Sequence, residues 1–223
     1  MKKKIISFSI WGSNPMYTTG AIKNILLQES IYPGWTCRFY VEKNHAILEE
    51  LKKYNCEIVI KDSGTCLGLF WRFEPAFDET VDLFIVRDCD SRINQREADA
   101  VKEWEESEYN IHSMKDHFYH RNYHLLGGMW GAKNPALLGY KKLMEDFILK
   151  TKKNRTFLKR EIFFDTDQYF LNAILWPFIS NQCLTHDDLG HQMNQNKSFK
   201  IKLPPGLFVG QQLYADDKPL PLN

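Results

Sequence analysis

Two aspartates that directly follow an apolar run are the residues whose type and spacing best suit chemistry. Asp88 and Asp90 come after the stretch from Val81 to Val86, in the segment VRDCDSR. This pattern predicts a buried strand that ends by presenting two carboxylates to solvent. Carboxylate oxygens are the hard ligands that Mg²⁺ and Mn²⁺ take beside substrate phosphates. The spacing therefore favours a divalent metal site for a diphosphate.

Basic side chains surround this pair of aspartates. Arg87 and Arg92 flank it, as an anionic ligand would require. The alternative is an acidic turn at a strand end that pairs with its own arginines. An Asp-x-Asp motif alone is weak evidence, because roughly one is expected by chance in such a chain. A second one occurs at Asp165 and Asp167.

The size and charge of the chain narrow the classes of function. Its 223 residues, of which 43% are hydrophobic, suffice for one substantial core and predict a single domain over residues 1–223. The 29 basic and 28 acidic residues are mixed along the sequence and leave a net charge of +1. No strongly basic field is evident, so nucleic acid is not an expected partner.

The cysteines and the N-terminal residues indicate in which cellular compartment the protein is expected. The five cysteines are odd in number, dispersed and without a C-x-x-C pair, which favours a reducing compartment, the cytoplasm. The basic start and the apolar run behind it imitate a secretory signal, but Ser7 and Ser9 interrupt the run and Gly12 opens a turn. We expect a first strand there. No apolar stretch approaches the roughly 20 residues that span a bilayer.

Strands and helices alternate in the predicted secondary structure. The hydrophobic pattern predicts strands over residues 5–10, 37–41, 57–60, 82–86, 110–114 and 128–132. It predicts helices from Asn14 onward, over 46–54 and 69–77, after Asn94, from Asn134 and over 166–175. The alternation indicates an α/β fold with a Rossmann-like, mixed but mainly parallel sheet flanked by helices. Asp88 and Asp90 then lie at its carboxyl edge, where such sheets bind ligands.

Two local expectations complete this picture. The first helix should bury Ile22, Ile25 and Leu26 against the sheet. From Asn181 onward the chain is rich in Asn, His, Pro and Gly, so we expect it to wrap over the sheet edge as loops.

Several segments, taken together and in order, resemble a family of small GT-A glycosyltransferases that occurs in bacteria and in large algal viruses. They run from about Ser7 to Gly210 and so cover nearly the whole chain. The matching segments are SFSIWGSNPMYTTGAIKN, IYPGWTCRFYV, FWRFEPA, VRDCDSR with READAVKEW, MKDHFYH, LGGMWGAKNPAL, DTDQYFL and FVG.

The resemblance implies a GT-A fold, with a nucleotide-sugar-binding half over about residues 1–107 and an acceptor-binding half over about residues 108–223. It implies a hexosyltransferase that uses a nucleotide-diphosphate sugar, with UDP favoured, and a glycan or glycoprotein as acceptor. Mn²⁺ or Mg²⁺ would lie between the Asp-x-Asp carboxylates and the diphosphate. A late histidine would add a ligand, with His186 as the first candidate and His191 as the second.

Residues around the first strand are candidates for donor binding. Ser9, Trp11 and Gly12 end that strand, where glycine lets a ligand approach the backbone and tryptophan offers a stacking face. Tyr17 lies in the first turn of the next helix, whose N–H groups suit phosphate. The alternative is a packed tryptophan above an ordinary capped turn.

Three residues near the aspartate pair are further candidates for donor binding. Trp71 and Arg72 lie just before the metal strand, and the arginine offers the diphosphate or the base a planar fork of donors. A surface ion pair of Arg72 with Glu74 or Asp78 is the alternative. Arg87 and Asp88 are also candidates for donor binding, although strand alternation points their side chains to opposite faces of the sheet.

Two glycines and two carboxylates are the candidates for sugar binding and catalysis. Gly127 and Gly128 leave the backbone bare for a sugar ring, or mark a bulge. Asp116 or Asp167 could take the proton of an acceptor hydroxyl, as an inverting transferase requires. The pair of Asp167 and Gln168 resembles the Asp-Gln of glycogenin-type retaining enzymes, so the stereochemistry stays open.

Other functions fit the sequence less well. A catalytically silent module that binds sugars or nucleotide sugars is the alternative from a different class, and it suits the 14% aromatic content. A Mg²⁺-dependent nucleotidyltransferase would show a glycine-rich basic loop after the first strand, where SIWGSNPMY has no Lys or Arg. An aspartyl phosphatase would carry its Asp pair after the first strand rather than after a middle one.

Overall fold

One mixed sheet of eight strands organises the residues that the computed structural model describes, which are 2–62, 66–153, 166–190 and 195–221. The strand order is β3-β2-β1-β4-β6-β5-β7-β8. Neighbouring strands are parallel except where β6 runs against β4 and β5. The strands are β1 (Lys3–Ile10), β2 (Thr36–Glu42), β3 (Glu57–Lys61), β4 (Val81–Val86), β5 (Ile111–Lys115), β6 (Trp130–Lys133), β7 (Cys183–Asp187) and β8 (Asn196–Lys197). The predicted α/β class is confirmed.

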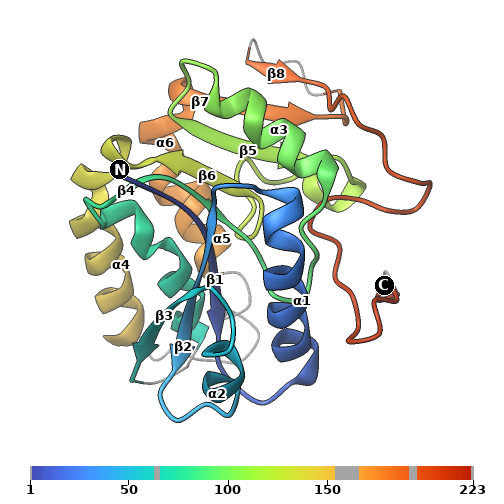
Figure 1. The fold of residues 1–223 in the computed structure, drawn as a ribbon. Coiled ribbons are helices and arrows are strands. Elements are labelled where there is room, and N and C mark those ends of the chain that lie inside the picture. Colours follow the sequence, from blue (N-terminus) through green and yellow to red (C-terminus); the bar gives the residue numbers. More distant parts are fainter. Residues whose placement is uncertain (1, 63–65, 154–165, 191–194, 222–223) are drawn as a thin grey trace.

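Helices cover both faces of this sheet (Figure 1). The α-helices are α1 (Pro15–Ile31), α2 (Ile47–Leu51), α3 (Gln95–Glu105), α4 (Lys141–Lys153), α5 (Thr166–Tyr169) and α6 (Trp176–Ile179). The 3-10 segments are η1 (Cys66–Phe77), η2 (Phe118–His120), η3 (Asn134–Ala136), η4 (Leu138–Tyr140) and η8 (Ser180–Gln182), and η7 (Phe170–Leu175) is a π-helical stretch. Together they make a three-layer α/β arrangement.

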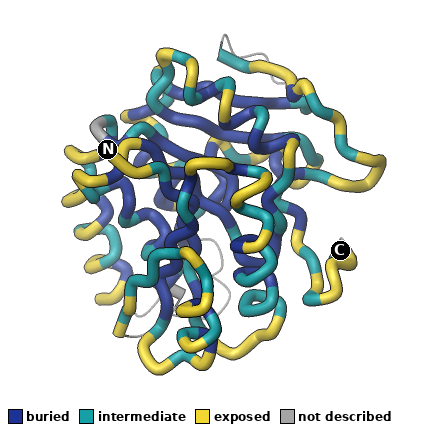
Figure 2. Tube along the Cα trace, viewed as in Figure 1, coloured by how far each residue is buried: buried dark blue, intermediate teal, exposed yellow. Residues whose placement is uncertain are grey.

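Each face of the sheet has its own apolar core. The core on one side includes Ala21 of α1, Leu51 of α2 and Trp104 of α3. The core on the other side includes Phe70 of η1 and Met144 of α4. Figure 2 shows the strands buried between these layers and the connecting loops exposed. Because both faces of the sheet are covered, its strands are mostly apolar throughout.

The first helix begins where the sequence predicts but turns a slightly different face to the sheet. The Asn14 side chain caps α1 by accepting a hydrogen bond from the Met16 N–H over 3.0 Å. The buried face contains the small residues Gly20 and Ala21 together with Ile25. Leu26 is 65% exposed, so its expected burial is wrong. One residue corresponds to about 100° around a helix, and close packing at Gly20 and Ala21 centres the contact away from Leu26.

The second half differs from expectation in three elements. The helix expected from Asn134 consists of two 3-10 turns, η3 and η4, before α4. The helix expected over residues 166–175 starts as α5 and widens into the π-helical η7. The third difference is β7, which lies in the stretch expected to be loop. Its five residues are all buried, so it shows no alternation that would have marked it as a strand.

Two further observations concern the cysteines and the lengths of the helices. Cys37, Cys56, Cys89 and Cys183 are free thiols. Among the residues that the structure describes, none of the helices has the length and apolar character needed to cross a membrane.

Candidate functional site

Strand β4 delivers the two aspartates to the carboxyl edge of the sheet. Val86 belongs to the core shared with η1, and the alternation of the strand places Asp88 on the same side. The Asp88 side chain is 38% exposed, whereas Asp90 is almost completely buried. The strand and its two aspartates therefore lie where the sequence predicts, but the expected exposure of Asp90 to solvent is wrong.

Helix α1 holds the loop that carries these aspartates. The Asn24 amide donates to the Ser91 carbonyl and accepts from the Ile93 N–H, both over 3.0 Å. Gly20 faces the same loop, because a Cβ atom there would lie 1.8 Å from the Cys89 carbonyl oxygen. The close approach of α1 thus requires glycine at this position and fixes the loop backbone.

Arg72 joins two carboxylates that lie far apart in the sequence. Its Nη2 donates to Oδ2 of Asp167 over 2.9 Å, and its Nη1 donates to Oδ1 of Asp88. Arg72 and Asp167 are both buried. The two negative charges raise the pKa of Arg72, although burial acts in the opposite direction. Burial raises the pKa of Asp167, and the charge of Arg72 opposes that rise.

Gly127 and Gly128 lie directly against this bridge. A Cβ at Gly127 would lie 2.5 Å from Oδ2 of Asp167, and one at Gly128 would lie 1.8 Å from Oδ2 of Asp88. When the Gln168 amide is oriented to satisfy both of its polar atoms, it accepts from the Gly127 N–H over 2.9 Å. The structure therefore brings together five sequence candidates, namely Arg72, Asp88, Gly127, Gly128 and Asp167.

Two buried polar atoms near this bridge have no hydrogen-bond partner among the described residues. They are Oγ of Ser9, at the end of β1, and Nε of Arg72. An unpaired buried polar group costs about 1–3 kcal/mol, so such atoms are typically satisfied by a ligand or by water. The unpaired Nε of Arg72 belongs to the side chain that contacts both carboxylates, so it is available to a polar ligand at this position.

The remaining donor-site candidates of the first half lie at the same edge of the sheet. The rings of Trp11 and Trp71 meet edge to face with centroids 6.1 Å apart. Gly12 has φ of +71°, a conformation that favours glycine. Burial, followed by the negative charge of Asp90, raises the pKa of Tyr17 to about 12.

A segment near the C-terminus covers Asp90. The Gln212 side chain donates to Oδ2 of Asp90 over 2.8 Å, and the Leu213 N–H donates to the Asp90 carbonyl over 2.7 Å. Burial and then the charge of Asp88 raise the pKa of Asp90 to about 7. Sequence reasoning missed Gln212, because 122 residues separate it from Asp90 and no local pattern marks it.

The carboxylate pair suits a cation, but it does not complete a coordination shell. A buried Asp90 beside Asp88 concentrates negative charge that a divalent ion would offset. Within the described ranges, no group of three or more His, Cys, Asp or Glu side chains could hold a metal ion. A cation bound here would therefore take further ligands from substrate phosphates and water, as Mg²⁺ commonly does.

The structure places His186 away from this pair. His186 lies on β7, where its Nδ1 is 2.9 Å from Nε2 of His112 and its Nε2 is 3.5 Å from a carboxylate oxygen of Glu103. Burial lowers the pKa of His186. The ring is thus packed between the sheet and α3 instead of lying in a loop. The second candidate, His191, lies outside the described residues, as does Asp165.

Arg87 lies on the opposite face of β4 from Asp88. Its Nε donates to Oε1 of Glu97 over 3.0 Å, and its Nη2 lies 3.4 Å from the Tyr32 hydroxyl. All three side chains are buried between the sheet and the helices α1 and α3. The contacts of Arg87 therefore support the sheet, and they do not bring it to the bridge around Arg72.

Asp116 is likewise engaged elsewhere. Its carboxylate accepts from Nε of Arg96 over 3.0 Å and from the Val209 N–H over 3.1 Å. Burial raises the pKa of Asp116 to about 6. These partners belong to α3 and to the C-terminal segment, so Asp116 fastens that segment to the sheet. Of the two carboxylates predicted for acid–base work, Asp167 is the one that lies beside Asp88.

Comparison with known proteins identifies the type of fold. No protein-family model matches the chain, and no curated protein matches it. A glycosyltransferase involved in the glycosylation of the major capsid of PBCV-1 has a similar structure, with a TM-score of 0.51 and 12% identity over 83% of this chain and 81% of that one. The glycosyltransferase GlyE of Streptococcus pneumoniae TIGR4 gives a TM-score of 0.50 and 15% identity over 83% of this chain and 45% of that one. The chain therefore has a GT-A-like fold, as its sequence segments predict.

Proposed function

We propose that this protein is a metal-dependent glycosyltransferase of the hexosyltransferase type. It would move a sugar from a nucleotide-diphosphate sugar, with UDP favoured, to a hydroxyl of a glycan or glycoprotein. The observation that carries the proposal is the convergence of Asp88, Arg72 and the bare backbone of Gly128 at the carboxyl edge of a GT-A-like sheet. The dispersed, free cysteines favour a cytoplasmic setting.

Asp88 and Asp90 would hold Mn²⁺ or Mg²⁺, which when bound neutralises negative charge on the leaving nucleotide diphosphate. Arg72 is placed to bind the same diphosphate, because its guanidinium already contacts Asp88 and keeps one buried donor, Nε, unpaired. Trp11 and Trp71 would flank the nucleotide base. Residues 1–107 would therefore mainly bind the donor, the nucleotide-diphosphate sugar.

The second half would contribute the sugar and acceptor contacts. Gly127 and Gly128 let the backbone lie directly against the carboxylates of Asp167 and Asp88, where a side chain would not fit. A sugar ring would lie over this part of the site. Asp167 would orient a sugar hydroxyl or accept the proton of the acceptor hydroxyl. Its raised pKa and its hydrogen bond from Arg72 suit either role.

The test is thermal unfolding with UDP, GDP, CDP and dTDP, each with and without Mn²⁺. A ligand at about 100 times its Kd adds roughly 2.7 kcal/mol to the free energy of unfolding. For a chain of this size, that raises Tm by roughly 5 to 10 °C. A shift that requires both the metal and one nucleotide supports the proposal. No shift with any nucleotide in folded protein would overturn it.

Turnover separates the transferase from a silent binding module. Release of the nucleotide from the matching sugar nucleotide should require both Asp88 and Asp90, and the Asp88→Asn/Asp90→Asn double variant should lose it while remaining folded. Nucleotide binding without any release, across an acceptor panel that includes water, would favour the binding module instead.

A further inference from the structure

Strand β3 ends the sheet and leaves one of its edges without a partner strand among the described residues. Its sequence is Glu-Ile-Val-Ile-Lys, from Glu57 to Lys61. The Ile60 side chain is 59% exposed, and none of the five residues is fully buried. An apolar edge strand with free N–H and C=O groups is a template for pairing with another chain.

The backbone direction shows which groups of β3 are free. The Lys61 carbonyl accepts a hydrogen bond from the N–H of Lys43, the residue that follows β2. Because successive residues of a strand direct their backbone groups to opposite edges, Glu57 and Val59 also face β2. The N–H and C=O groups of Ile58 and Ile60 therefore point outward, away from the sheet.

The sequence of β3 is complementary to itself in the antiparallel direction. If two copies meet with Val59 opposite Val59, then Ile58 lies opposite Ile60, and Glu57 lies opposite Lys61. The residues with outward backbone groups, Ile58 and Ile60, then form the hydrogen-bonded pairs of an antiparallel ladder. The same register joins the isoleucines on one face and opposite charges on the other. Backbone, apolar and charge patterns all select this register.

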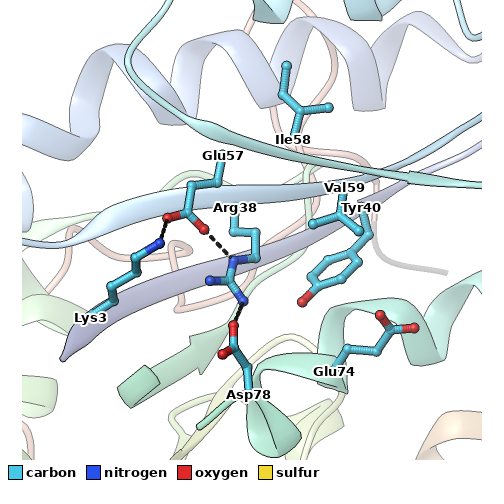
Figure 3. Close-up of a pocket in the computed structure, with 8 residues that line it drawn as sticks. All are labelled: Lys3, Arg38, Tyr40, Glu57, Ile58, Val59, Glu74 and Asp78. Atoms are coloured by element: carbon cyan, nitrogen blue, oxygen red, sulfur yellow. Dashed lines mark hydrogen bonds and ion pairs between the residues drawn. The ribbon is translucent and has the colours of Figure 1, made fainter. Parts of the chain in front are cut away.

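The surroundings of β3 leave room for such a partner. An open cleft of about 620 Å³ runs beside the strand, and Figure 3 shows Glu57 and Val59 directed to it, with Ile58 on the other side. Glu57 accepts hydrogen bonds from Lys3 and Arg38, both over 2.6 Å. The residues that line the cleft are Lys3, Arg38, Tyr40, Glu57, Ile58, Val59, Glu74 and Asp78. Lys61 of the same copy donates to Glu74 over 2.5 Å, so three cations balance three carboxylates in this region. The cleft therefore has no net charge that would repel a second copy.

We propose that β3 is a homodimer interface, in which two copies join their sheets by antiparallel pairing centred on Val59. The interface is isologous, since each copy contributes the same strand to a twofold contact. It lies at the opposite end of the sheet from β8 and uses none of the candidate site residues. The inference is therefore independent of the proposed function.

Sedimentation of the full chain tests the assembly. The wild-type protein should show a dimer that dissociates on dilution, at concentrations up to roughly 0.5 mM. Ile60→Lys puts a charge on the outer edge at an exposed position and should give a monomer. Leu26→Lys, at an exposed leucine of α1, is the matched control and should behave as wild type. A wild-type monomer throughout this range, or a dimer that survives Ile60→Lys, would overturn the proposal.

Cross-linking tests the register. In a Cys56→Ser background, Val59→Cys places two thiols directly opposite each other, within the Cα separation that a disulfide spans. Ile60→Cys is the matched control, because the two copies of residue 60 would be separated by roughly 8 Å along and across the strands, too far for a disulfide. Mild oxidation should link the Val59→Cys protein rapidly and the Ile60→Cys protein slowly or not at all. Equal rates in the two variants would contradict the register.

Discussion

Nη2 of Arg72 donates a hydrogen bond to Oδ2 of Asp167 over 2.9 Å, and this contact joins segments that are 95 residues apart. Both side chains are buried. The pair therefore connects η1 to α5, which follows the α4 helix in the chain, on the same face of the sheet. Geometry at the candidate site and stability of the fold depend on the same two side chains.

Replacing Asp167 should affect both properties. Asp167→Ala leaves a buried guanidinium with one partner fewer, which we expect to cost about 3–5 kcal/mol of unfolding free energy. Asp167→Asn keeps an acceptor for Arg72 and should cost less, yet it should still lose sugar transfer. Urea unfolding and nucleotide release measure the two effects. Asp146→Ala, which breaks an exposed ion pair with Lys142, is the control. Equal stability of the Asp146→Ala and Asp167→Ala variants would contradict this account.

A methyl group at Gly128 should disable the site without unfolding the protein. The new Cβ would lie 1.8 Å from Oδ2 of Asp88, so the carboxylate would have to move. Gly128 does not have a positive φ, so the variant tests this contact and not backbone strain. We expect Gly128→Ala to abolish the metal-dependent nucleotide shift in Tm. Gly139→Ala, where nothing lies within 4 Å of the new Cβ, should retain the shift. Retention of the shift in both variants would show that Asp88 has no role in binding.

Asp90→Asn should separate binding from stability. The substitution removes a buried negative charge that lies near Asp88, and the amide oxygen can still accept from Gln212. Without metal, the variant should therefore be at least as stable as the wild type. It should also lose the Tm increase that Mn²⁺ and nucleotide give together, as chelation with EDTA does to the wild type. A metal-dependent shift of wild-type size in this variant would remove Asp90 from the site.

Acid should lower the free energy of unfolding because buried histidines are uncharged in the folded state. The contribution of His120 can be measured separately. Burial, followed by the charges of His117 and Lys115, lowers the pKa of His120 to about 3. Between that value and about 6.5 the unfolded chain binds the extra proton. The free energy of unfolding should therefore fall as pH decreases through this window, by up to about 1.4 kcal/mol per pH unit for one group.

The variant for this measurement is His120→Asn, because Oδ1 of asparagine can replace Nδ1 as the acceptor of the Asp116 and His117 N–H groups. Urea unfolding at a series of pH values should give a shallower pH dependence for the variant than for the wild type. Parallel curves for the two proteins would mean that His120 does not titrate as its burial implies.

Local patterns in the sequence located most strands and helices of the first half of the fold, although the buried face of α1 differs at Leu26 and the helix expected over residues 69–77 is the 3-10 segment η1. The apolar run before Asp88 predicts β4. The alternation of that strand predicts that the side chains of Asp88 and Arg87 lie on opposite faces of the sheet, as they do in the structure. Asn14 marked the start of α1 through its capping side chain. These features depend on neighbours in the chain, so periodicity and capping rules describe them well.

Contacts between segments that are distant in the sequence could not be predicted from such local patterns. The bridge from Arg72 to Asp167 and the cover that Gln212 provides for Asp90 join residues 95 and 122 positions apart. Strand β7 is buried on both faces, so His186 sits in a sequence without the alternation of an ordinary strand. The assignment of His186 to a loop followed from that missing signal.

The reversed direction of β6 has a consequence for how this molecule can diversify. The chain leaves the sheet after Lys115 and re-enters it at Trp130, and because β6 is antiparallel to β5, both points lie at the same edge. The intervening excursion ends in Gly127 and Gly128. A segment that departs and returns at one end of the sheet can be lengthened at its exposed tip, near Phe118 and Tyr119, while every strand keeps its place. Under the proposed function, new sugar or acceptor preferences would arise from changes at that tip on an unchanged scaffold.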